Sequence, residues 1–148
     1  MRAVIQRVTN ATLSVDSKLV SKIDKGLLVY LGIGVDDTEV DRDWLINKIV
    51  NMRIFSDADD KINLSVKDIE GEILVVSQFT LYASTKKGNR PSFLRSAKPD
   101  QAIPIYDAFL VNLKKIVPTQ SGIFGADMQV AYTNDGPITI TIDTKHKE

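Results

Sequence analysis

The 148-residue sequence contains no cysteine and a single histidine, His146, which lies in the charged C-terminal tail. The lack of cysteine excludes disulfides, a thiolate nucleophile and any zinc site built on sulfur. A histidine so close to a chain end is poorly placed to hold a catalytic geometry, which argues against a Ser-His-Asp triad and a multi-histidine metal site. Chemistry carried out by this protein would therefore depend on hydroxyls, carboxylates, backbone groups or the substrate itself.

Long apolar runs are also missing. No stretch approaches the roughly 20 uncharged apolar residues that a membrane-spanning helix needs. Arg2 and Arg7 interrupt the N-terminus before the apolar region of a signal peptide could form. The 19 basic residues balance the 19 acidic ones, and 43% of the residues are hydrophobic. We therefore expect one globular domain over residues 1–148, in the cytoplasm and with no membrane partner.

Charge is unevenly placed along the chain. The stretch between Ala83 and Pro99 has no acidic residue, and its internal glycine and proline predict an extended loop. The loop carries a set of basic residues: Lys86, Lys87, Arg90, Arg95 and Lys98. Two interpretations stay open, a solvated surface loop and a contact for a phosphate backbone.

Hydrophobic periodicity predicts the order of helices and strands. Strand-like patterns cover residues 3–8, 12–23 as a hairpin, 27–33 as a buried strand, 73–82, and 128–142 as a hairpin. Helical spacing follows Thr38, which is an N-cap candidate with Asp41 three residues later. A second helical pattern runs from Pro99 to Pro118, and we expect Pro104 to kink or delay its first turn. The order predicts a mixed α/β fold of layered β-sheets with two main helices, in place of a doubly wound parallel sheet.

Two short segments carry candidate chemistry. Residues 77–80 place Ser77, Gln78, Phe79 and Thr80 at the end of the predicted strand 73–82. On a strand, Gln78 and Thr80 would share one face, where an amide and a hydroxyl could hold a carbonyl or stabilise an oxyanion. The alternative is a strand end whose polar groups satisfy loop backbone. The second segment, 134–137 (NDGP), consists of turn residues, and its Gly-Pro bond can also be cis.

Taken together, residues 77–81 (SQFTL) and 134–139 (NDGPIT) resemble the two signature motifs of the D-aminoacyl-tRNA deacylases of the D-Tyr-tRNA deacylase type. Four further segments resemble that family in order and spacing: 1–8, 53–58, 90–93 and 126–130. The resemblance implies the fold of that family and hydrolysis of the ester between a D-amino acid and tRNA, with rejection of L-aminoacyl-tRNA. Glycyl-tRNA, as in glycine mischarged on tRNA-Ala, is an expected second substrate.

The resemblance also implies a homodimer with shared active sites. The peptide between Gly136 and Pro137 would be cis and would enter the site of the other subunit, where its carbonyls exclude a side chain in the L position. Arg7 would hold that peptide in its orientation, because a guanidinium donates several hydrogen bonds in a fixed fork.

Further roles come from the same resemblance. Ser77, Gln78 and Thr80 would handle the scissile ester and the terminal ribose, and Phe79 would shape the pocket. Phe124 and Met128 would surround the terminal adenine, although core packing also explains both. The basic residues Lys86, Lys87, Arg90 and Arg95 would contact the tRNA backbone at the acceptor end.

Two mechanisms are open for Thr80, a nucleophile or a positioning group. The sequence supplies no histidine base for a nucleophile, which favours assistance by the 2′-hydroxyl of the terminal adenosine. No metal or cofactor is expected, because an aminoacyl ester is already activated.

Two competing functions remain. The fold implied by the resemblance is shared with the editing module of archaeal threonyl-tRNA synthetases, which removes L-serine, but that module lacks the Gly-Pro motif found here. A non-catalytic protein that binds RNA ends would be insensitive to changes at Ser77, Gln78 or Thr80.

Overall fold

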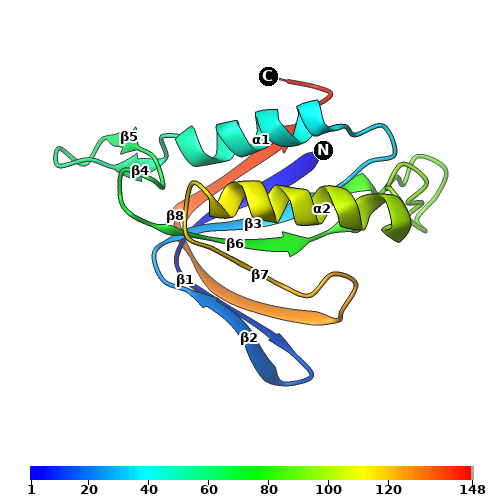
Figure 1. Ribbon diagram of the computed structural model, residues 1–148, viewed down its shortest axis with the longest axis horizontal. Coiled ribbons are helices and arrows are strands. Elements are labelled where there is room, and N and C mark those ends of the chain that lie inside the picture. Colours follow the sequence, from blue (N-terminus) through cyan, green and yellow to red (C-terminus); the bar gives the residue numbers. More distant parts are fainter. Residues whose placement is uncertain (148) are drawn as a thin grey trace.

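The computed structural model describes residues 1–147, and it confirms a mixed α/β fold in which two helices cover one face of a sheet (Figure 1). The six-stranded sheet has the order β2-β1-β3-β6-β7, and β8 pairs with the other edge of β1. Its strands are β1 (Arg2–Val15), β2 (Lys18–Ile23), β3 (Gly26–Gly32), β6 (Glu72–Ser77), β7 (Thr119–Ser121) and β8 (Met128–Asp143). A separate two-stranded sheet joins β4 (Phe55–Ser56) to β5 (Ile62–Leu64).

The predicted N-terminal hairpin is present. Asp16 and Ser17 connect β1 to β2 with φ angles of 49° and 61°. Two consecutive residues in the left-handed region form the kind of tight turn that matches the twist of an antiparallel pair. The strand predicted at residues 27–33 is β3, which is buried almost throughout.

Both predicted helices are present. In α1 (Glu39–Asn51), the Asp41 carboxylate accepts hydrogen bonds from the backbone N–H and the hydroxyl of Thr38, both at 2.9 Å. The second helix, α2 (Pro99–Lys114), begins at Pro99 and passes through Pro104 without interruption. The expected delay of its first turn is wrong, because the buried face of the helix continues on both sides of the proline. No helix within residues 1–147 is long and apolar enough to cross a membrane.

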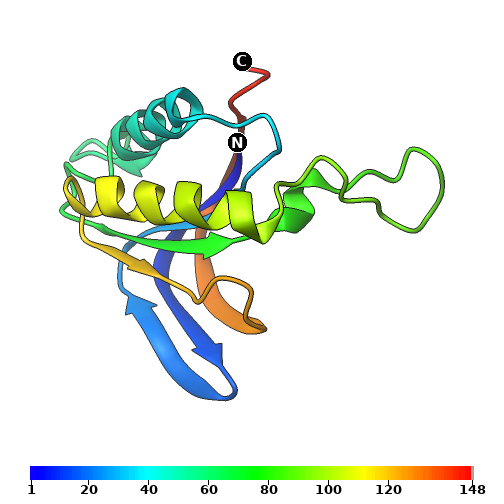
Figure 2. The same ribbon diagram turned by 45° about the vertical axis from the view of Figure 1, so that its right-hand side comes forward.

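Two apolar clusters lie on opposite faces of the sheet. The larger one packs the helices on the sheet, with Leu45 of α1 and Phe109 of α2 fully buried against residues such as Val75. The smaller one includes Leu13 and Leu74. Figures 1 and 2 show the β1–β2 hairpin and the adjoining part of β8 bending away from the helices, and this curl of the sheet covers the smaller cluster.

The strand predicted over residues 73–82 is wrong in its second half. Strand β6 ends at Ser77, and Phe79–Tyr82 forms one turn of 3₁₀ helix, η1. Parallel pairing stops here because β3 itself ends: the Gln78 N–H makes a last bond to the Leu31 carbonyl at 2.8 Å. The next residues then bond locally, Leu81 N–H to the Gln78 carbonyl at 3.3 Å, and the chain turns.

The hairpin predicted at residues 128–142 is also wrong. Strand β8 runs without reversal along β1, with Thr139 opposite Gln6 and Asn134 opposite Val8. Arg7 therefore stands opposite the whole segment 135–138, which bulges out of the ladder. The turn residues make a bulge here because β1 is long enough to offer a partner on both sides of them.

A buried charge cluster anchors η1 to the N-terminal end of β1. The α-amino group of Met1 donates to one oxygen of Asp37 at 2.5 Å, and both groups are almost completely shielded from water. The other Asp37 oxygen accepts from the Gly34 N–H at 2.7 Å and the Tyr82 hydroxyl at 3.2 Å. Because Tyr82 belongs to η1, the cluster helps to position that turn.

Candidate active site

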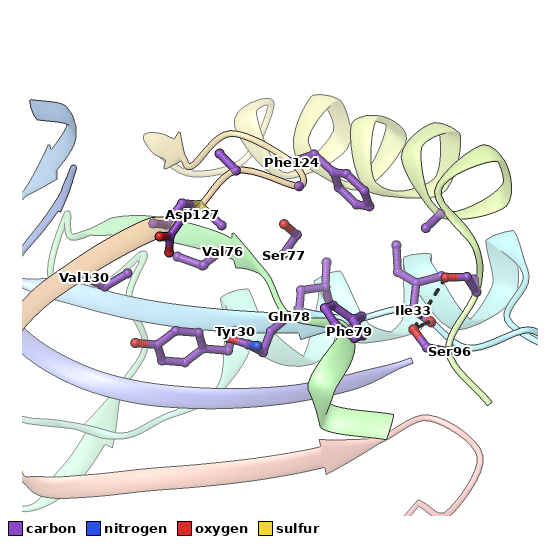
Figure 3. A pocket seen from close by; sticks show the side chains of 16 residues that line it. Tyr30, Ile33, Val76, Ser77, Gln78, Phe79, Ser96, Phe124, Asp127 and Val130 are labelled. Carbon is purple, nitrogen blue, oxygen red and sulfur yellow. Dashed lines mark hydrogen bonds between the residues drawn. The ribbon is translucent and has the colours of Figure 1, made fainter. Parts of the chain in front are cut away.

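A cavity of about 460 Å³ lies where β6 ends, between η1, the first turns of α2 and the loop that leads into β8 (Figure 3). This volume falls within the range of small-molecule binding sites. Most of the lining is apolar, and a few side chains provide polar groups: Tyr30, Ser77, Gln78, Ser96 and Asp127.

Ser77 provides a hydroxyl at the end of β6. Figure 3 shows its side chain pointing into the cavity, and the side chain makes no hydrogen bond within residues 1–147. Its neighbour Gln78 also lines the cavity and donates its amide N–H to the Thr80 hydroxyl. Thr80 is exposed and does not line the cavity. The η1 turn, and not the alternation of a strand, therefore brings the amide and the hydroxyl together.

Aromatic side chains border the cavity on two sides. Phe79 is 56% exposed at the rim and packs edge to face against Phe93, with ring centroids 5.0 Å apart. Phe124 packs edge to face on the buried Tyr106 of α2 at 5.5 Å. Phe79 and Phe124 both line the cavity, so it offers aromatic ring surface against which a flat ring could pack.

Met128 reaches the cavity because a glycine lies behind it. A Cβ atom at Gly122 would come within 2.4 Å of the Met128 sulfur. Any larger residue at position 122 would displace the thioether. The close approach of Met128 to the cavity is therefore set by the loop before β8.

The cavity is poor in groups that could accept a proton. Burial and the neighbouring Tyr132 raise the pKa of Tyr30 to about 12, so its hydroxyl stays protonated near neutral pH. Burial likewise raises the pKa of Tyr106 above its ordinary range. Asp127 is the one carboxylate in the lining, which contains no histidine. Within the described part of the chain, no three His, Cys, Asp or Glu side chains gather in a way that could hold a metal ion.

Arg7 organises a second group of residues at the bulge in β8. Its guanidinium donates to the Ile54 carbonyl at 2.7 Å and the Asp135 carbonyl at 3.3 Å, and it pairs with the Asp135 carboxylate at 3.0 Å. The Gly136–Pro137 peptide bond is cis. Both of these residues are exposed, and neither lines the cavity of its own chain.

The model of the family described as D-Tyr-tRNA(Tyr) deacylase matches residues 4–143, nearly the whole chain. The chain belongs to this family. It is thus a deacylase, an enzyme that hydrolyses D-aminoacyl-tRNA.

Two solved structures resemble this deacylase over almost their full length. One is a c-Myc DNA unwinding element binding protein, with a TM-score of 0.92 and 42% sequence identity, covering 97% of this chain and 98% of the other. The other is a probable eukaryotic D-amino acid tRNA deacylase, with a TM-score of 0.79 and 21% identity, covering 95% of this chain and 97% of the other. The second comparison shows a shared fold.

The residues predicted for the deacylase site fall into three places. Five of them line the cavity together: Ser77, Gln78, Phe79, Phe124 and Met128. Thr80 contacts that group through Gln78, whereas Gly136 and Pro137 lie in the bulge and Arg7 lies opposite it on β1. The basic residues Lys86, Lys87, Arg90 and Arg95 line a separate cavity on the loop after η1.

Sequence reasoning missed three polar residues of the cavity, Tyr30, Ser96 and Asp127. Asp127 lies between Phe124 and Met128 in the sequence, and that adjacency was a usable signal. Tyr30 sits in the apolar run of β3 and Ser96 in an irregular loop, so neither has a local pattern that marks a cavity.

Proposed function

We propose that the cavity beside Ser77 holds the 3′-terminal adenosine of a D-aminoacyl-tRNA and its ester bond. The observation that carries this assignment is the convergence of Ser77 and Gln78 with Phe124 and Met128 in one cavity, although the two pairs are far apart in sequence. The aromatic ring and the thioether suit a flat base, and the hydroxyl and amide suit the ester.

Ser77, Gln78 and Thr80 act as hydrogen-bonding groups that hold the ester. The cavity lining contains no histidine or lysine that could activate a hydroxyl nucleophile. The attacking group is instead a water molecule, which the 2′-hydroxyl of the terminal ribose activates and directs to the ester carbonyl. A tRNA ending in 2′-deoxyadenosine should then be hydrolysed poorly, whereas Asp127→Asn should stay active; the reverse pattern would make Asp127 the base.

The bulge acts on the other subunit of a homodimer. Gly136 and Pro137 are exposed and lie outside the cavity of their own chain, while β8 pairs only with β1 among residues 1–147. A second copy could therefore present its bulge to the cavity. There the two carbonyls would exclude an L side chain by clash and leave room for hydrogen or a D side chain. Glycyl-tRNA would pass the same filter, including glycine mischarged on tRNA-Ala.

Mixing two variants tests the shared site. Ser77→Ala alters the cavity and should lower hydrolysis, whereas Arg7→Ala releases the bulge from its hydrogen bonds and should allow hydrolysis of the L ester. After subunit exchange with an equal amount of Ser77→Ala, the L-ester hydrolysis of Arg7→Ala should fall to about half, because half of its intact cavities then face an intact bulge. An unchanged rate, in a preparation shown by native mass spectrometry to contain mixed dimers, would mean that bulge and cavity of the same chain act together.

The substrate is tested by deacylation of D-tyrosyl-tRNA beside L-tyrosyl-tRNA and glycyl-tRNA, with chelator present throughout. We expect loss of the D and glycyl esters and survival of the L ester. Hydrolysis of the L ester at a similar rate would refute the filter. The work of the enzyme on tRNA esters also implies a cytoplasmic location, which fractionation can check.

A second candidate function is binding of DNA in addition to hydrolysis. It is favoured by the name of the 42% identical neighbour, a DNA unwinding element binding protein, and by the basic loop. In that case Ser77→Ala would lower hydrolysis and leave the binding of single-stranded DNA unchanged.

A further inference from the structure

The loop between η1 and α2 contains a second cavity of about 460 Å³. Figure 2 shows this loop projecting from the body of the molecule beside the first turn of α2. Two backbone hydrogen bonds between Ser84 and Ser92, both 2.9 Å, close its base. The lining has no acidic residue and includes four cations: Lys86, Lys87, Arg90 and Arg95.

Within the described residues 1–147, these four cations have no partner of opposite charge. None of them forms an ion pair or a side-chain hydrogen bond with any residue from 1 to 147. Six other basic side chains of residues 1–147 lie within 4.0 Å of a carboxylate, as Arg7 does with Asp135. A concave surface lined by four unpaired cations and no carboxylate has the charge expected of a site for phosphate groups.

Two segments of the chain contribute to both cavities, with different residues lining each. In η1, Phe79 lines the active-site cavity and Tyr82 lines the second one. In the segment before α2, Ser96 lines the active-site cavity while Arg95 lines the second one. Phe79 is 56% exposed and packs edge to face on Phe93, and the two chain neighbours of Phe93, Ser92 and Leu94, line the second cavity. We call this aromatic pair, which connects the linings of the two cavities, the ridge.

We propose that the two cavities and this ridge form a continuous track for the single-stranded 3′ end of tRNA. The inference rests on the proposed function, which places the terminal adenosine beside Ser77. The preceding base stacks on the aromatic ridge, and the phosphates of the preceding nucleotides lie among Lys86, Lys87 and the two arginines. Stacking and lysine contacts to phosphate both tolerate any base, so the track suits an end shared by all tRNAs.

The test compares two esters that differ only in the part of the track they can reach. D-Tyrosyl-adenosine carries no phosphate, whereas the D-tyrosyl ester of the trinucleotide CCA reaches the ridge and the loop. The readout is a ratio, the kcat/KM for the trinucleotide ester divided by the kcat/KM for the adenosine ester. The double variant K86A/K87A is compared with K114A/K115A, which removes an exposed lysine pair at the end of α2.

We expect K86A/K87A to lower this ratio about tenfold, because the trinucleotide ester loses its phosphate contacts. K114A/K115A should keep the wild-type ratio. The slope of log kcat/KM against log salt for the trinucleotide should become shallower by about 1.4, since each single-strand phosphate contact contributes about 0.7. Phe93→Leu should also lower the ratio but leave the salt slope unchanged, which separates stacking from charge.

Three results would overturn the track. The first is an unchanged ratio in K86A/K87A, and the second is an equal fall in both double variants, which would show an effect of net charge alone. The third is loss of single-stranded DNA binding in K86A/K87A with no change in the ester ratio, which would make the loop a separate DNA site. Failure of wild-type protein to hydrolyse either D ester would refute the proposed function instead.

Discussion

Replacement of Asp37 by alanine should destabilise the protein more than any comparable change of surface charge. Its carboxylate is 1% exposed and accepts from the Met1 amine, the Gly34 N–H and the Tyr82 hydroxyl. The variant would leave a buried ammonium without its counter-charge and a buried hydroxyl without its acceptor. Removal of one partner from a buried ion pair typically costs about 3–5 kcal/mol. This is a large share of the roughly 5–15 kcal/mol that stabilises an ordinary domain.

Urea denaturation, followed by the fluorescence of the single tryptophan, Trp44, measures this cost directly. With a slope near 2 kcal/mol per molar urea, the midpoint should fall by about 2 M. Asp36→Ala is the matched control, because Asp36 is the adjacent residue and is exposed; its effect should stay within about 0.5 kcal/mol. The protein must carry no N-terminal tag, so that the Met1 amine is free.

The reasoning is refuted if Asp37→Ala unfolds within about 1 kcal/mol of wild type with an unchanged slope. That result would mean that water or a rearranged side chain replaces the carboxylate at no cost. Asp37→Asn keeps the size and an acceptor oxygen but removes the charge, so it should lie between alanine and wild type.

Three further predictions follow from the site and the N-terminus of α1. Gly122→Ala should raise KM for D-aminoacyl-tRNA about tenfold with a smaller change in kcat, because its Cβ would displace the Met128 sulfur; an unchanged KM would remove Met128 from the adenosine site. Thr80→Ala should keep kcat within about tenfold of wild type, whereas a loss near 10⁴-fold would support Thr80 as the nucleophile. Burial raises the pKa of Asp41, but hydrogen bonds from Lys145 and Thr38 outweigh it and hold that pKa well below its usual range. Its stabilisation is therefore present above the unfolded-state pKa of about 4 and is lost as pH falls, so urea midpoints at pH 6 and pH 3 should differ less in Asp41→Asn than in wild type.

Several elements were predictable because their determinants are local. Thr38 and Asp41 mark the start of α1 through hydrogen bonds three residues apart. The β1–β2 turn depends on two adjacent residues, and the burial of β3 follows from its continuous apolar run. The structure places Ser77 and Gln78 in one cavity, and their role in the site stays a prediction from the motif.

The remaining features depend on partners distant in sequence. The end of β6 at Ser77 follows from the end of β3, and the resulting η1 turn brings Gln78 to Thr80. Residues 134–137 would form a hairpin turn on their own, but pairing of β8 with the whole of β1 makes them a bulge opposite Arg7. The cavity itself unites Tyr30 with residues about 100 positions away. Local sequence thus determined where helices and turns begin, whereas strand ends, bulges and cavities were decided by tertiary structure, because each needs a hydrogen-bonding or packing partner that no local pattern contains.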